Sequence, residues 1–215
     1  LMKYRIQVEI EYLIALSGSV AELEDFPVYR LKDLRGIFKN FSEEKAEEIK
    51  EIEKTTNHDV KALEYYIKKE FDSLKLDAFK EFVHFGLTSQ DINNTAIPLL
   101  LKNFIEYEYY PAVESLLSRL NGIAKEWKDV PMLAHTHGQP ASPTRVGKEI
   151  MVFAARLEKQ LNQVKAVPFS AKFGGATGNL NAHYVAYPTI DWNKFADYFC
   201  NHLGLVRSFP TTQVE

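Results

Sequence analysis

Polar residues that could do chemistry gather at three points of the chain, each just before an expected helix. The first is Asn57-His58-Asp59. Free amides and the helix dipole at such a start can receive an anion. There a cationic His58 is disfavoured, so it would serve better as a hydrogen-bonding ligand than as an acid. Plain helix capping explains the same residues, and taken alone it is the favoured interpretation.

The second cluster runs from His84 to Asp91. The hydroxyls of Thr88 and Ser89, together with the first amides of a helix, could converge on a carboxylate oxygen. Capping by either residue is again the simpler alternative. This cluster by itself is therefore a weak indication of a carboxylate site.

The third cluster is His135-Thr136-His137-Gly138-Gln139-Pro140, a polar loop between two apolar helical patterns. Two histidines one residue apart occur in metal-dependent hydrolases, but such sites need further ligands on alternating strands, for which no pattern exists here. Histidine also titrates near neutral pH, which suits a general acid or base. The glycines at 174–178 do not follow G-x-G-x-x-G after a strand, so they predict a turn rather than a dinucleotide site.

Helical periodicity supplies the elements that must position these clusters. Apolar residues recur from Ile6 to Leu16, and Ser42 is a suitable N-cap for a helix reaching Lys54. Thr56 with Asp59, and Thr88 with Asp91, have the spacing of capping boxes. We expect each pair to begin a helix.

Further along, helical periodicity runs from 91 to 128, where Pro98 and Pro111 predict kinks or a restart. Residues 132–140 are expected to be non-helical, and Ser142-Pro143 to begin the next helix. A last helix should span about 191–203 and end at Gly204. The predicted fold class is all-α: a small N-terminal helical domain (residues 1–93), then the opening part of a long helical bundle (residues 94–215).

Composition narrows the function classes. With 26 basic and 29 acidic residues the net charge is −3, which predicts neither nucleic-acid binding nor a polybasic membrane patch. Cys200 is the only cysteine, so no disulfide framework or thiolate zinc cluster is expected, and a reducing compartment fits. No apolar run approaches a membrane span, and no signal peptide is evident. These features predict a soluble cytoplasmic protein.

Five stretches together resemble the adenylosuccinate lyases, most of all their bacterial branch, within the fumarase/aspartase superfamily. They match in order and spacing across essentially the whole chain, so jointly they are far more specific than any one motif. The stretches are residues 55–62 (TTNHDVKA), 84–94 (HFGLTSQDINN), 136–141 (THGQPA), 178–183 (GNLNAH) and 211–213 (TTQ).

The resemblance implies a β-elimination that releases fumarate from adenylosuccinate or from the succinyl-carboxamide ribotide of purine synthesis. It implies an all-helical homotetramer that acts on a small anionic substrate, shares its sites between subunits and uses no metal or organic cofactor. His137 would be the general acid, and Thr88 and Ser89 would bind the succinyl carboxylates. Asn57, His58 and Asp59 would line the substrate site. Gln213 would contact the substrate, and His84 would lie close by.

The chain departs from the family pattern in several places. The family's catalytic serine loop and phosphate-binding basic residues lie downstream of Gln213, and its Arg-Tyr pair lies upstream of Leu1, so we interpret the chain as an N-terminal fragment. Arginine is common in the family where this chain has His135, which leaves that residue's role open. Three alternatives remain: a sibling lyase acting on argininosuccinate, fumarate or aspartate, a non-catalytic helical scaffold whose clusters are only caps, and a metal-dependent hydrolase, which chelator resistance would exclude.

We therefore expect the 215-residue chain by itself to be inactive, because it lacks the base that removes the substrate proton. The measurement is fumarate release from adenylosuccinate by the purified chain. Robust release would contradict the inferred need for a downstream serine.

Overall fold

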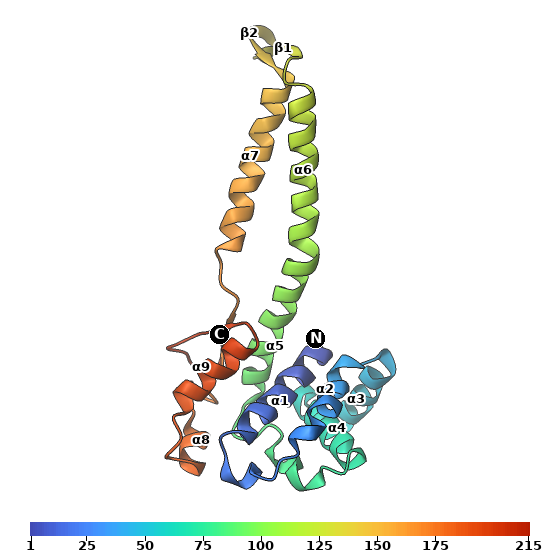
Figure 1. The fold of residues 1–215 in the computed structure, drawn as a ribbon, viewed down its shortest axis with the longest axis vertical. Helices are drawn as coiled ribbons and strands as arrows, with labels where there is room; N and C mark the ends of the chain where they lie inside the picture. The colour runs from blue at the N-terminus through green and yellow to red at the C-terminus, as the bar shows by residue number, and fades with distance from the viewer. The chain divides into compact units, whose positions relative to one another are not determined.

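The computed structural model describes all 215 residues, which form two compact units. The first unit comprises Leu1–Leu101 and Phe169–Glu215, and the second comprises Lys102–Pro168 (Figure 1). The boundary predicted between residues 93 and 94 falls inside a helix of the first unit. That boundary stays a prediction about the family's domains.

Helices α1 to α4 and the start of α5 build most of the first unit, and α8 and α9 complete it. Their bounds are α1 Met2–Ser17, α2 Leu31–Lys39, α3 Glu43–Thr56, α4 Asp59–Ser73, α5 Ser89–Phe104, α8 Asn181–Ala186 and α9 Trp192–His202. Short 3₁₀ turns cover Ala21–Leu23, Val28–Arg30 and Asp77–Phe82. Two short strands, β3 (Ser170–Ala171) and β4 (Val206–Arg207), pair in parallel within the segment Phe169–Glu215.

Helix α1 is the central element of this unit and packs against both α2 and α4. It is apolar on most sides rather than along one stripe, as expected of a helix enclosed by others. Its core residues are at most 1% exposed: Ile6, Val8, Ile10, Tyr12, Leu13 and Leu16. The few polar side chains that α1 carries inward are therefore placed in a largely apolar environment.

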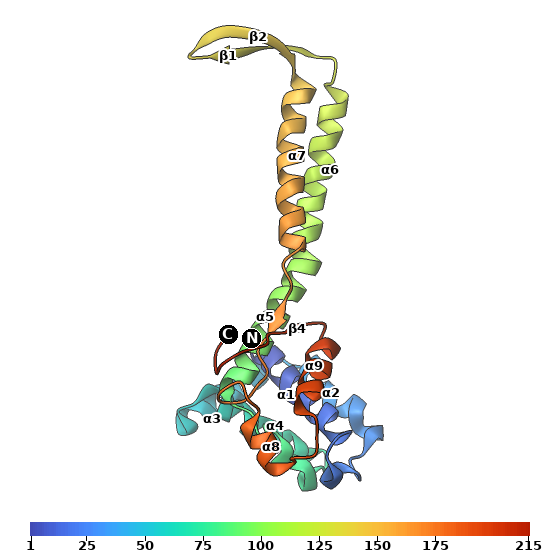
Figure 2. The same cartoon turned by 90° about the vertical axis from the view of Figure 1, so that its left-hand side faces the viewer.

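In the second unit, α6 (Tyr110–Glu126) and α7 (Val146–Lys165) lie side by side as an antiparallel pair (Figure 2). A π-helical turn, Ile105–Tyr109, precedes α6, and Pro111 stands in the first turn of α6. Proline offers no N–H and crowds the carbonyl four residues earlier, so a wider turn just before it relieves the conflict. The predicted restart thus takes the form of a π-turn in an otherwise continuous helix.

A two-stranded antiparallel hairpin joins α6 to α7, with β1 at Pro131–Thr136 and β2 at Gln139–Arg145. The prediction of a non-helical segment is confirmed. The prediction that the next helix starts at Ser142-Pro143 is wrong, because β2 continues to Arg145 and α7 begins at Val146. Pro140 and Pro143 are tolerated because both strands of such a ribbon are edge strands.

Most other local predictions are confirmed. Asp191 caps α9 by accepting from the Lys194 amide at 3.1 Å, and Gly204 follows the helix at φ +71°. The Thr56 box is an exception: α3 continues through Thr56, and His58 is the N-cap of α4. Helices dominate, so the all-α class holds, and no helix is long and apolar enough to cross a bilayer.

Gly147 allows the close crossing of α6 and α7. A Cβ there would lie 2.3 Å from the Ala124 carbonyl oxygen and 2.7 Å from backbone atoms of Lys128, so the backbones must move apart. We expect Gly147→Ala to destabilise the protein by about 1–3 kcal/mol. Gly122 is also helical, but a Cβ there would meet nothing within 4 Å, so Gly122→Ala should instead stabilise by up to about 1 kcal/mol. Urea unfolding of both variants measures the difference, and equal effects would contradict the crossing argument.

Candidate functional site

The start of α5 is held by the carboxylate of Asp91, which is fully buried. Its Oδ1 accepts from Lys172 Nζ at 2.7 Å and from the amides of Gly174 and Gly175 at 2.9 and 3.0 Å. Its Oδ2 accepts from the Thr88 amide at 2.9 Å, which is one half of the predicted capping box. Asp91 thereby fixes the turn that presents Thr88 and Ser89.

Pro98 explains how Lys172 reaches this position. Because proline has no N–H, the Asn94 carbonyl one turn earlier loses its partner within α5. The Lys172 amide donates to that carbonyl at 3.2 Å, and the Thr95 hydroxyl donates to the Lys172 carbonyl at 3.3 Å. The proline in the helix thus creates the docking point for the segment that carries the buried lysine.

The glycine loop then brings the C-terminal segment to the same region. Gly178 adopts φ +83°, and a Cβ there would be 2.2 Å from the Thr211 carbonyl oxygen. The Thr211-Thr212-Gln213 string therefore lies against the loop whose other end binds Asp91. Gln213 itself is exposed.

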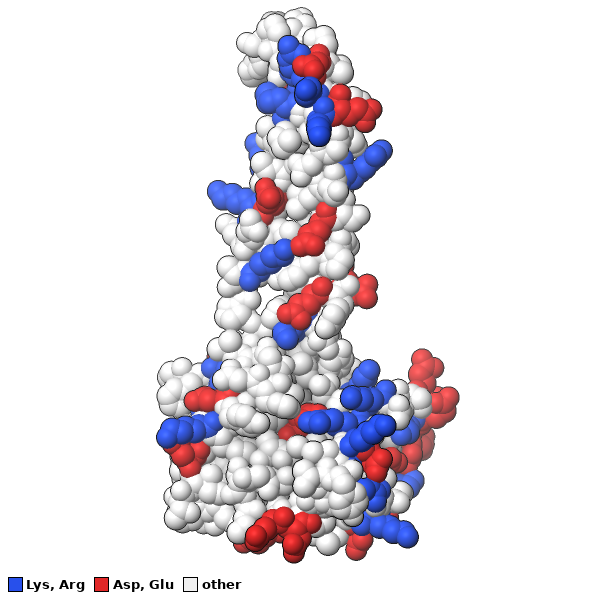
Figure 3. Space-filling view, viewed as in Figure 1, with Lys and Arg blue, Asp and Glu red and all other residues white.

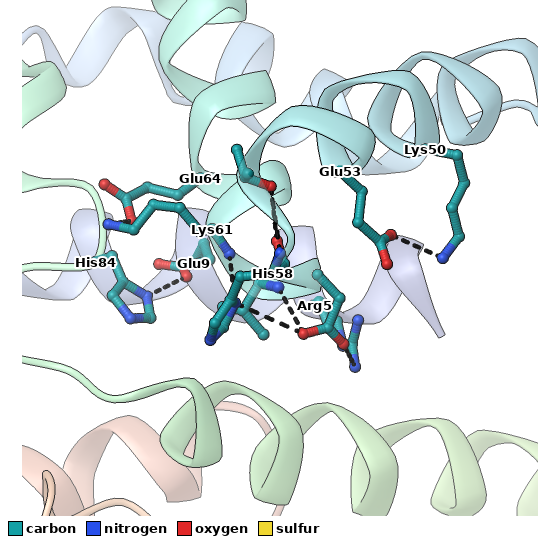
Figure 4. Close-up of polar contacts among 11 residues, drawn as sticks. Arg5, Glu9, Lys50, Glu53, His58, Lys61, Glu64 and His84 are labelled. Atoms are coloured by element: carbon teal, nitrogen blue, oxygen red, sulfur yellow. Dashed lines mark hydrogen bonds and ion pairs between the residues drawn. The ribbon is translucent and has the colours of Figure 1, made fainter.

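One face of α1 holds the two remaining clusters of the first unit. Arg5, Glu9 and Tyr12, spaced by four and three residues, share that face. Arg5 Nη2 lies 2.7 Å from Asp59 Oδ2, and Glu9 Oε1 lies 2.6 Å from His84 Nδ1 (Figure 4). Residues 57–59 and the loop beginning at His84 are thus both tied to α1.

The Asn57-His58-Asp59 string is the junction between α3 and α4. Asn57 ends α3 with φ +51°, and His58 Nδ1 accepts from the Lys61 amide at 3.2 Å. Histidine replaces the predicted Thr56 as cap because Asn57 reverses the chain before α4 begins. A surface hollow of about 620 Å³ lies beside this junction, lined by Ile52, Thr55, Thr56, Lys61 and Tyr65.

Charges at this junction are paired, Asp59 with Arg5 of α1 and Lys61 with Glu64 within α4. Burial acts to raise the pKa of Asp59, but the Arg5 guanidinium and the Val60 amide outweigh it and hold the pKa below its usual value. Lys61 Nζ lies 2.6 Å from Glu64 Oε2 (Figure 4). Asp59 is therefore an anion near neutral pH, which fits hydrogen-bond acceptance better than proton donation.

Two opposing effects act on the pKa of His84. Burial lowers the pKa of its imidazole, but the fully buried Glu9 carboxylate outweighs burial and raises the pKa above the usual value. His84 also adopts φ +62°, a conformation uncommon for a residue with a Cβ. Residues held in such sparsely populated backbone conformations cluster at functional sites.

His137 belongs to the second unit, so the structure describes it apart from the other predicted site residues. It forms a two-residue turn with Gly138 between Thr136 and Gln139. Both turn residues have positive φ, +52° and +76°, as a type I′ hairpin turn requires. The turn leaves the His137 side chain exposed.

The first unit brings Thr88, Ser89 and the segment of Gln213 together around Asp91, and it ties Asn57-His58-Asp59 to the same face of α1 as His84. Sequence reasoning missed three residues that hold them: Arg5, Glu9 and Lys172. The sequence did carry one signal, charge within apolar surroundings, because Arg5 and Glu9 interrupt the apolar pattern at the start of the chain. No group of three or more His, Cys, Asp or Glu side chains is arranged to hold a metal ion.

A family model described as Lyase matches residues 1–214. The chain belongs to this lyase family. It is 52% identical over 225 residues to adenylosuccinate lyase from Dictyostelium discoideum, covering 100% of this chain and 48% of that protein. It is 41% identical over 218 residues to adenylosuccinate lyase from Escherichia coli strain K12, with the same coverage of 100% and 48%. The resemblance predicted from the five stretches is thereby confirmed, and the chain spans about half the length of these curated relatives.

Solved structures show the same fold at low sequence identity. A fumarate lyase from Mesorhizobium sp. BNC1 superposes with a TM-score of 0.76 at 18% identity, covering 97% of this chain and 46% of that one. A 3-carboxy-cis,cis-muconate lactonizing enzyme from Pseudomonas putida gives a TM-score of 0.74 at 18% identity, covering 97% and 45%. These likenesses agree with the predicted helical architecture.

The pairing of Asp91 with Lys172 can be tested by stability. Both side chains are 0% exposed, so Lys172→Met leaves a buried carboxylate without its counter-ion, and we expect a loss of about 3–5 kcal/mol. Lys194 forms a matched pair with Asp191 at 3.1 Å in which the lysine is 86% exposed, and Lys194→Met should change stability little. Denaturant unfolding compares the two variants. Similar stabilities would show that the buried pair is unimportant.

Proposed function

We propose that this chain is part of an adenylosuccinate lyase. The reaction is a β-elimination: a base removes a proton next to a succinyl carboxylate, the carbon–nitrogen bond breaks, and an acid protonates the departing nitrogen. Adenylosuccinate gives AMP and fumarate, and the succinyl-carboxamide ribotide of purine synthesis releases fumarate in the same way. Identity of 40–52% to curated adenylosuccinate lyases over nearly the whole chain supports this assignment.

The observation that carries the proposal is the preorganised start of α5. Asp91 holds Thr88 and Ser89 at the first turn of a long helix, where amide groups and the dipole favour an anion. These residues would bind the succinyl carboxylates. The doubly charged intermediate of the elimination concentrates negative charge on those carboxylates, so donors fixed in advance would lower the barrier.

The other predicted residues would complete the substrate site. Asn57, His58 and Asp59 would line it beside the hollow near Lys61, and Gln213 would reach it from the segment packed on Gly178. His137 would be the general acid, which an exposed imidazole on a hairpin turn can supply if another part of the assembly covers it. No cofactor is needed for this chemistry.

Assembly into a homo-oligomer, proposed to be a tetramer with shared sites, is supported by the second unit. Its buried core is small: Leu117, Ala154 and Leu161 form one cluster, and Ala124 is the other buried hydrophobic residue. Large apolar side chains such as Phe104, Leu116 and Phe153 are 49–61% exposed. Uncharged areas separate the interspersed charges along this helix pair (Figure 3). Exposed apolar surface of this kind marks interaction sites. With a single buried cysteine, Cys200, the cytoplasm is the proposed location.

The test is fumarate release by the protein expressed from its complete gene, with and without His137→Ala. We expect activity on adenylosuccinate and a loss of about 10²–10⁴-fold in turnover for the variant. His202→Gln, a histidine outside the proposed site, is the control and should retain turnover. Wild-type protein active only on argininosuccinate, fumarate or aspartate would move the assignment to a sibling lyase. Inactivity on all of them would favour a non-catalytic scaffold.

A further inference from the structure

The loop from His84 to Thr88 joins two groups of the proposed site, and Tyr12 of α1 is hydrogen-bonded to the backbone of this loop. The Tyr12 hydroxyl donates to the Phe85 carbonyl at 2.6 Å. Three residues earlier on the same face of α1, Glu9 holds the His84 side chain at 2.6 Å. One helix face therefore fixes two consecutive residues of the loop, one by its side chain and the other by its backbone.

His183 is the second support, and it belongs to the 178–183 stretch to which no role has been assigned. It lies on α8, is fully buried, and places Nε2 2.9 Å from the Tyr12 oxygen. Its ring also lies against the loop: a Cβ on Gly86 would be only 2.8 Å from His183 Cε1, and Gly86 has φ +67°. Only glycine allows the loop backbone to approach the imidazole this closely.

The hydrogen-bond directions follow from the donors available. The single Tyr12 hydrogen goes to the Phe85 carbonyl, so the His183 ring must donate from Nε2 to the Tyr12 oxygen. Nδ1 then carries a lone pair, and this buried atom has no hydrogen-bond partner. Burial lowers the pKa of His183 to about 4, which keeps the ring neutral near pH 7.

A purely apolar role in the core does not explain this histidine. An unpartnered buried nitrogen is unfavourable, and a phenyl ring would fill an aromatic environment of Trp192, Phe85 and Tyr12 without it. The feature that phenylalanine cannot supply is the Nε2 donor to Tyr12. The imidazole is thus best explained by what it does to the tyrosine hydroxyl.

We propose that Tyr12 and His183 are positioning residues that hold the loop from His84 to Thr88, through the Phe85 carbonyl, in the conformation that binds substrate carboxylates. Neither side chain needs to touch the substrate. This inference rests on the proposed function, because it assigns the two residues a role in the same site. It predicts that weakening either hydrogen bond impairs substrate binding before it impairs folding.

The experiment uses the protein expressed from its complete gene and compares Tyr12→Phe, His183→Phe and His183→Gln in kinetics and melting temperature. Tyr12→Phe and His183→Phe should raise the KM for adenylosuccinate about tenfold, with a smaller fall in kcat, because misplaced binding groups weaken ground-state and transition-state binding together. Glutamine places an amide nitrogen where His183 has Nε2, so His183→Gln should keep KM within about threefold of wild type. Tyr66→Phe, which also removes a buried hydroxyl, is the matched control and should leave KM unchanged.

A merely structural role would lower the melting temperature without changing KM well below it. Unchanged KM in Tyr12→Phe and His183→Phe overturns the inference, as does a His183→Gln variant as impaired as His183→Phe. If wild-type protein releases no fumarate from adenylosuccinate, the proposed function fails separately. Crystal structures of Tyr12→Phe and His183→Phe then decide the inference: a displaced 84–88 loop supports it, and an unmoved loop overturns it.

Discussion

The buried carboxylate of Asp91 is the interaction on which the arrangement of the first unit depends. A carboxylate at 0% exposure is stable only when its lone pairs are satisfied, and four donors from two separate stretches do so here. Those donors are the Thr88 amide, the Lys172 ammonium and the amides of Gly174 and Gly175. Satisfying one charge therefore forces the start of α5 and the glycine loop, 81 to 84 residues apart in sequence, into one place.

Helix α1 adds the second constraint. Its Arg5, Glu9 and Tyr12 reach the α3–α4 junction, the His84 side chain and the Phe85 carbonyl respectively. The α3–α4 junction and the loop that begins at His84 lie at separate points of the sequence, and α1 contacts both, so α1 sets their relative positions. The proposed substrate groups are thus carried by loops and helix starts, while rigid helices behind them determine where they point.

The second unit differs from the first in how little apolar surface it buries. Its helix pair buries only a small core of its own and leaves large apolar side chains exposed along α6 and α7. Its hairpin carries His137 on an exposed turn with positive φ. Such an element is stabilised by covering surfaces rather than by internal packing, which is why we propose a shared, oligomeric site rather than one complete within a single copy of the chain.

Local chemistry in the sequence determined the helices, the Asp191 and Gly204 boundaries of α9 and the Pro111 irregularity. Tertiary structure alone decided that His58 rather than Thr56 caps α4, that residues 131–145 form a hairpin, and that Lys172 and the glycine loop bind the Asp91 carboxylate. The reason is the sequence distance over which each kind of interaction acts. Caps and periodicity depend on neighbours within about four residues, whereas a buried charge or an edge strand is stabilised by distant partners that no local pattern specifies.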